Sequence, residues 1–165
     1  MIQLEQEKCV YDVLEKLDIS FTRYEHGAVF TVEEVRQLDI TISGGHTKNL
    51  FLRNRKGDQH YLVIVSEEKD VDLKRLSKLI GSTPLSFGSA ERLNKYLNVY
   101  PGAVGAFGLI NDCTNHVQVV VDSDLLEKDT INFHPNVNTA TVNLSIQEFR
   151  RYLDYVNNPV SIINF

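Results

Sequence analysis

The stretch from Ser43 to Ser66 constrains the fold most strongly, because its pattern is that of a β-hairpin built around one buried strand. Two runs of strand-forming residues, 50–52 and 61–65, flank a polar turn. Gly57 lies in that turn and is free to adopt the positive φ that a tight connection often needs. The run 61–65 has no polar alternation, which predicts a central strand covered on both faces.

The other predicted elements mix helices and strands without a regular βαβ order. This mixture favours one α+β domain over residues 1–165, with a mixed sheet and surrounding helices, rather than a doubly wound fold. Helices are predicted over residues 3–18, 32–38, 72–79, 90–97 and 145–156, and further strands over 19–25, 117–121, 130–133 and 139–143. Hydroxyl or carboxylate side chains cap four of these helices, at Thr31, Asp72, Ser89 and Ser145.

Composition excludes several classes of protein. The net charge of −5 argues against a protein that coats nucleic acid, including DNA. No apolar run approaches the roughly 20 residues that a membrane span needs, and the N-terminus lacks the plan of a signal peptide. Two cysteines without a Cys/His cluster indicate a reduced, cytoplasmic protein with no metal and no cofactor, and Cys9 is expected to be a buried thiol.

Positive charge is concentrated in the middle of the chain. Residues 46–95 contain 10 Lys and Arg against 6 Asp and Glu, whereas the remainder contains 7 against 16. A basic middle in an acidic shell can meet one phosphate group or one anionic end of a partner. Exposed helices often carry such charges without binding anything, and this alternative stays open.

Three segments could hold binding groups. Lys48 and Asn49 begin a rigid strand after two glycines, although spacing alone favours a solvated strand-end lysine. The segment 100–112 has three glycines whose amides can approach a ligand, or it is a tight buried connection. His134 precedes a proline that holds it extended on a loop, whereas His26 fits a simple turn better than a pocket.

Three ordered motifs give the chain a family resemblance: HTKNLFLRNRKGDQHYLVIV at 46–65, LSFGSAERLNKYLNVYPGAVGAFGLIND at 85–112 and FHPNVNTATVNLS at 133–145. Together with His26 and residues 30–34, they resemble the free-standing relatives of the prolyl-tRNA synthetase editing domain, which are trans-editing aminoacyl-tRNA deacylases. The resemblance runs from about residue 20 to the C-terminus. It implies a mixed, strongly curved, barrel-like sheet surrounded by helices, and hydrolysis of mischarged tRNA, typically alanine on proline tRNA.

The resemblance also assigns roles to residues. It makes Lys48 the catalytic residue, with Asn49 and His134 orienting the ester and the terminal adenosine. It places Gly102 in the loop that lines the amino-acid pocket. The predicted substrate-binding set is completed by Ala106, His26 and Asn111. Ala106 stands where the family usually has proline, so the size limit of the pocket can differ. A substrate hydroxyl helps to activate the water, since no protein base is evident.

The implied partner is the acceptor end of an aminoacyl-tRNA, with prolyl-tRNA synthetase as a second partner. The enzymatic hypothesis requires the Lys48 ammonium to face a confined cavity rather than open solvent. Two alternatives remain. One is a non-catalytic binding module that senses an amino acid or aminoacylated RNA, which the departure at Ala106 leaves open. The other is a cysteine hydrolase using Cys113, which has no assigned histidine beside it.

Overall fold

We describe the protein from a computed structural model, in which residues 2–28 and 42–165 are placed. The predicted helix over residues 32–38 and its cap at Thr31 lie outside these ranges.

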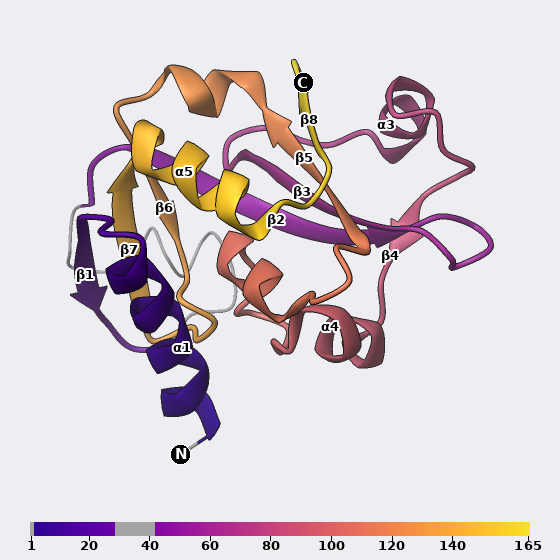
Figure 1. Cartoon of the computed structure of the whole chain (residues 1–165). Helices are drawn as coiled ribbons and strands as arrows, with labels where there is room; N and C mark the ends of the chain where they lie inside the picture. The colour runs from indigo at the N-terminus through magenta and orange to yellow at the C-terminus, as the bar shows by residue number, and fades with distance from the viewer. Residues whose placement is uncertain (1, 29–41) are drawn as a thin grey trace.

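The strands form one curved mixed sheet that does not close into a barrel (Figure 1). Its order is β1-β7-β6-β2-β3-β5-β8, and the short strand β4 pairs with β2. The β2–β6, β3–β5 and β5–β8 pairs are parallel, and the others are antiparallel. The strands are β1 Phe21–Glu25, β2 Gly45–Arg53, β3 His60–Ser66, β4 Ser86–Phe87, β5 Val117–Asp122, β6 Thr130–Phe133, β7 Ala140–Ser145 and β8 Val160–Ile163.

The predicted hairpin is confirmed as β2 and β3. Strand β3 lies between β2 and β5, and its residues 60–65 are buried, as the apolar run predicted. Gly57 has a φ of 78°, so the turn does use its conformational freedom. The side-chain oxygen of Asn54 accepts hydrogen bonds from the amides of residues 57, 58 and 59. That oxygen therefore organises the turn.

The helices lie on both faces of the sheet, and α3, α4 and α5 begin directly after their predicted caps. They are α1 Ile2–Lys16, α3 Leu73–Leu79, α4 Ala90–Leu97 and α5 Ile146–Val156, with two 3₁₀ helices, η1 Ala106–Asn111 and η2 Ser123–Glu127. Asp72, Ser89 and Ser145 each accept from a first-turn amide, which confirms these caps. The expectation for Cys9 is wrong, because its side chain is exposed on the solvent side of α1. No helix in residues 2–28 or 42–165 is long and apolar enough to span a membrane.

Two apolar clusters cover the two faces of the hairpin. Leu62 and Ile64 of β3 face the main core, which includes residues of α4, η1 and α5. Tyr61 and Val63, which alternate with them, face a second cluster with Leu76 of α3. Successive side chains of a strand point to opposite faces, so each residue of β2 or β3 can be assigned to one cluster.

Candidate active site

Strands β2 and β6 pair only briefly and then separate. Gly45 and His46 pair with β6, and Leu52 and Arg53 pair with β4 on the same side. Residues 47–51 have no strand partner on that side within the described part of the chain, and we call this opening the β2–β6 split. Figure 1 shows β6, β7 and β1 running in a different direction from β2, β3 and β5.

The main chain of Asn49 is turned toward the split. The carbonyl of Phe51 accepts from the Gly88 amide at 2.8 Å on this side of β2. Main-chain groups of alternate residues in a strand face the same side, so those of Asn49 do as well. The side-chain oxygen of Asn49 is buried and finds no partner among the described residues, while its amide nitrogen donates to Thr47 at 3.1 Å. A buried acceptor without a partner is typical of a group that a ligand completes.

His134 follows β6 directly, at the border of the split. Its Nδ1 lies 2.9 Å from the carbonyl of Ala140. A carbonyl can only accept, so Nδ1 carries the hydrogen and Nε2 carries the lone pair. Burial lowers the pKa of His134, the hydrogen bond to the Ala140 carbonyl opposes this in part, and the nearby His26 adds a smaller lowering effect. The ring is therefore neutral near pH 7 and presents Nε2 as an acceptor.

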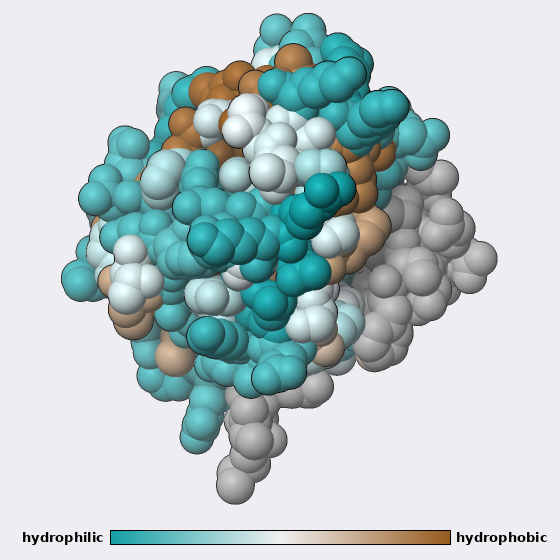
Figure 2. All heavy atoms as spheres, turned by 90° about the vertical axis from the view of Figure 1, so that its right-hand side faces the viewer, coloured by the Kyte–Doolittle hydropathy of each residue, from teal (hydrophilic) through white to brown (hydrophobic). Residues whose placement is uncertain are grey.

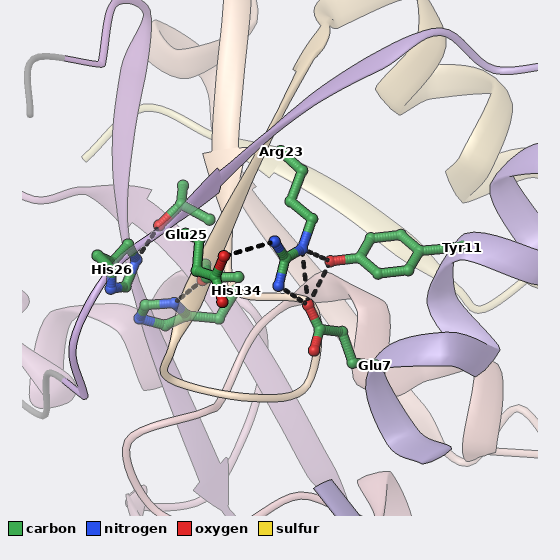
Figure 3. Close-up of polar contacts among 8 residues, drawn as sticks. Glu7, Tyr11, Arg23, Glu25, His26 and His134 are labelled. Atoms are coloured by element: carbon green, nitrogen blue, oxygen red, sulfur yellow. Dashed lines mark hydrogen bonds and ion pairs between the residues drawn. The ribbon is translucent and has the colours of Figure 1, made fainter. Parts of the chain in front are cut away.

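His26 lies beside His134, with 6.0 Å between the ring centroids (Figure 3). Its Nδ1 is 2.8 Å from the Gly27 carbonyl and must donate to it. Its Nε2 is 2.9 Å from the hydroxyl of Thr141, which donates when the ring is neutral. Two histidines that were predicted from separate motifs thus meet at one place.

The glycine loop, which we define as residues 102–105, also reaches His134. Gly102 has a φ of 100°, a conformation that residues with a side chain rarely adopt. A Cβ built on Gly105 would lie 3.5 Å from the carbonyl oxygen of His134, an ordinary van der Waals distance, so the two main chains are neighbours. Ala106 follows with its side chain fully buried in the main core, and its carbonyl accepts from the Tyr152 hydroxyl at 2.7 Å. The methyl group of Ala106 therefore belongs to the core.

Two asparagines that were not singled out from the sequence hold the loop against the residues after His134. The side-chain oxygen of Asn138 accepts a hydrogen bond from the Tyr100 hydroxyl at 2.8 Å. The main-chain amide of Asn138 donates to the same hydroxyl at 3.0 Å. The fully buried Asn136 donates to the Phe107 carbonyl at 3.3 Å. Their place in the polar loop between two strands was the available signal.

Lys48 lies on the other face of β2. The continuous register with β3 places its side chain with Leu50 and Leu52, over the second cluster, and the side chain of Asn49 over the main core. The half-buried ammonium of Lys48 donates to the carbonyl of Lys69. It is not in open solvent, but the described contacts do not bring it to Asn49 or His134.

The carbonyl that holds Lys48 is itself fixed by a buried carboxylate. Asp122 is fully buried and accepts from the Ser66 amide at 3.1 Å and from the Lys69 ammonium at 2.9 Å. Asp124 accepts from the same ammonium at 2.6 Å. These bonds set the turn after β3 and thus the position of the Lys69 carbonyl.

Asn111 is used for a different purpose. Its side-chain amide donates to the carbonyl of Leu97 at 2.8 Å, which satisfies a free carbonyl at the C-terminus of α4. The structure therefore brings together His26, His134 and the glycine loop, with Asn49 across the split, and leaves Lys48 and Asn111 apart from them.

Comparison with known proteins gives these residues a context. The family model for the aminoacyl-tRNA editing domain matches residues 26–152. The chain is 41% identical over 162 residues to the prolyl-tRNA editing protein ProX of Acetoanaerobium sticklandii, covering 98% of this chain and 99% of the relative. It is 36% identical over 166 residues to the prolyl-tRNA synthetase associated domain-containing protein 1 of Xenopus laevis, covering 98% and 97%.

A similar fold is found among crystal structures. One is described as a candidate trans-editing enzyme for prolyl tRNA synthetase. It superposes with a TM-score of 0.72 at 21% identity, covering 97% of each chain. At this identity the match shows the fold.

Proposed function

The chain belongs to the aminoacyl-tRNA editing domain family, and from this premise we propose that it is an aminoacyl-tRNA deacylase acting in trans. The observation that carries the proposal is the contact of the glycine loop with His134 beside the β2–β6 split. This arrangement combines the main chain of the glycine loop, a neutral imidazole acceptor and the unpartnered oxygen of Asn49. These groups suit a polar substrate with an ester, an amine and a ribose.

The proposed reaction needs little from the protein because an aminoacyl ester is already labile. A water oxygen attacks the carbonyl carbon, the ester C–O bond breaks, and the tRNA oxygen leaves with a proton. Main-chain amides of the glycine loop stabilise the oxyanion, which is the largest contribution in many acyl transfers. His134 Nε2 accepts a hydrogen bond from the water or from a ribose hydroxyl, and Asn49 accepts one from the substrate amine.

Lys48 remains our candidate for the catalytic cation. A lysine has a flexible four-carbon side chain and can exchange one acceptor for another at small cost. In the proposed complex, the ammonium leaves the Lys69 carbonyl and meets either the negative charge that develops on the ester carbonyl oxygen during attack or the charge of the terminal phosphate. The buried Asp122 then acts on the reaction only by holding the turn that contains Lys69.

We further propose alanine on proline tRNA as the substrate and prolyl-tRNA synthetase as a partner. Support comes from the names of the relatives and from the small residues of the glycine loop. A small pocket excludes proline by bulk, although each methylene discriminates by only about 1–3 kcal/mol. The side chain of Ala106 is buried in the core and does not line the pocket. A proline at position 106 would therefore stiffen the chain directly after the glycine loop without changing the size of the pocket.

The test follows ester loss from a panel of purified aminoacyl-tRNAs, with alanyl-tRNA for proline as the leading member. We expect hydrolysis well above the blank, lowered at least tenfold by Lys48→Ala. Asp12→Ala, which removes an exposed ion-paired residue of α1, is the matched control. Absence of hydrolysis for every small aminoacyl ester would refute the deacylase.

One observation favours a second candidate, a non-catalytic binding module. Lys48 is held on the face of β2 opposite to Asn49, away from the glycine loop. Such a module would bind alanine or aminoacylated RNA without turnover and would be insensitive to Lys48→Ala. Equilibrium binding of a non-hydrolysable aminoacyl-adenosine amide, measured beside the hydrolysis assay, separates the two.

A further inference from the structure

Two arginine side chains lie side by side at the tip of the β2–β3 hairpin. A Cβ added to Gly57 would meet Arg53 Nη1 at 2.8 Å and Arg92 Nη2 at 3.0 Å. Arg53 ends β2 and Arg92 comes from α4, so the tertiary fold brings two like charges together. Like charges this close repel each other, and their summed positive field attracts an anion.

Other cations extend this pair. Arg55 and Lys56 are exposed in the turn, and Lys95 is exposed one helical turn after Arg92. We call these five residues, Arg53, Arg55, Lys56, Arg92 and Lys95, the hairpin basic patch. Figure 2 views the molecule from this side, and its central surface is predominantly hydrophilic.

Few carboxylates neutralise the patch. Within the described ranges, Lys56 pairs with Asp58 at 3.6 Å, and the other four cations form no ion pair. Asp58 is also bound by the side-chain amide of Asn54. Glu91 of α4 is exposed and forms no ion pair with any of the five cations of the patch within the described ranges. The positive charge of the patch also affects the pKa of a buried histidine, His60. Burial and His116 lower the pKa of His60 most, and Arg92, Arg53 and Lys95 lower it further.

The patch lies on the same face of β2 as Asn49. Arg53 lies four positions after Asn49 in an unbroken strand, and side chains an even number of positions apart share one face. Four residues of strand span about 13 Å. Helix α4 covers the same face and leads through Tyr100 into the glycine loop. The split and the patch therefore lie at two places along the same face of β2.

We propose that the hairpin basic patch binds the phosphodiester backbone of the tRNA acceptor arm while the aminoacyl end occupies the β2–β6 split. The inference rests on the proposed function for the identity of the RNA. A patch of this size suits a few phosphates of one strand, and the net charge of −5 opposes broad coating of a duplex. Sequence readout is not required, because phosphate contacts position a nucleic acid without reading its bases.

The experiment measures binding of uncharged proline tRNA by fluorescence anisotropy at several salt concentrations. Arg53→Glu/Lys95→Glu should weaken binding at least tenfold at low salt and reduce the salt slope by about two. Arg55→Glu/Lys56→Glu changes only exposed turn residues and should act in the same direction. The control, Lys8→Glu/Arg150→Glu, makes the same charge change on α1 and α5, which lie over the other half of the sheet (Figure 1).

A second readout separates the patch from the active site. Both patch variants should raise KM for full-length aminoacyl-tRNA and leave hydrolysis of a short aminoacylated CCA fragment unchanged. Binding within twofold of the parent, or a loss equal to that of the control, overturns the patch. A parent that binds tRNA through the patch but hydrolyses no ester overturns the deacylase and leaves the patch standing.

Discussion

The imidazole rings of His26 and His134 lie 6.0 Å apart and edge to face, although one follows the first strand and the other follows the sixth. Strand β7 pairs with both β1 and β6 and so aligns the ends of these strands. The amide of His26 also donates to the Thr139 carbonyl at 3.0 Å, which extends the β1–β7 pairing up to the site. The pair therefore depends on the register of three strands.

Replacing His134 by alanine is expected to lower kcat about tenfold, because the water or the ribose hydroxyl loses the hydrogen-bond acceptor that positions it. Because burial lowers the pKa of His134 below 6.5, the neutral form persists below that pH. The parent rate should stay level from pH 8 to about 6.5 and fall only at lower pH, as protonation removes the Nε2 acceptor. A pH–rate profile of hydrolysis measures this. His116→Gln, which alters a histidine stacked on Tyr96 of α4, should leave the shape of the profile unchanged.

Replacing Gly102 by alanine is expected to lower both stability and activity. Its φ of 100° would cost a residue with a side chain about 1–3 kcal/mol, and relief of that strain would move the loop away from His134. Gly81→Ala is a matched control, since Gly81 has a φ of 70° but an open surrounding. Thermal unfolding and steady-state kinetics of both variants test this. Equal kinetic losses in the two would contradict a role for the glycine loop.

Replacing Glu7 by alanine is expected to destabilise the contact between α1 and β1. One oxygen of the buried Glu7 accepts from the Tyr11 hydroxyl at 2.6 Å and from Arg23 at 2.8 and 2.9 Å (Figure 3). The hydrogen bonds to Glu7 hold the Arg23 guanidinium in place. Burial raises the pKa of the Tyr11 hydroxyl. Loss of the shared acceptor should cost about 1–3 kcal/mol in urea unfolding. Lys8→Ala, which removes an exposed pair on the same helix, should cost less than about 0.5 kcal/mol.

Stability is expected to fall in acid because of His60. Arg92 Nη1 lies 3.1 Å from His60 Nε2 and can only donate, so Nε2 must be unprotonated and Nδ1 donates to His116 at 2.8 Å. The pKa of His60 is lowered from 6.5 to about 4 by burial first and then by His116. Between these values the unfolded chain binds a proton that the folded chain does not. Stability should therefore decrease as pH falls from 6.5 to 4 and level off below.

Urea unfolding at several pH values checks the effect of His60. His60→Gln removes the titrating group and should flatten the decline in that window. A slope that is the same in parent and variant would assign the acid sensitivity to other groups.

The local elements were predictable because their signals are local. The apolar run 61–65 predicted a buried strand, and Asp72, Ser89 and Ser145 cap helices through amides within their own first turns. The family motifs likewise pointed to His26, His134 and the glycine loop. The prediction that Cys9 is buried was wrong, because a position beside an apolar stripe does not show how wide the buried face of α1 is.

The sequence alone determined the hairpin, the helix ends and the family, since each depends on residues close together in the chain. Only the tertiary structure decided that Asn49 and Lys48 face opposite sides of the sheet with different partners. It also decided that β6 leaves β2 beside the glycine loop and that Arg53 meets Arg92. These outcomes depend on strand register and helix packing between distant segments, and local preferences of the backbone do not encode such pairings.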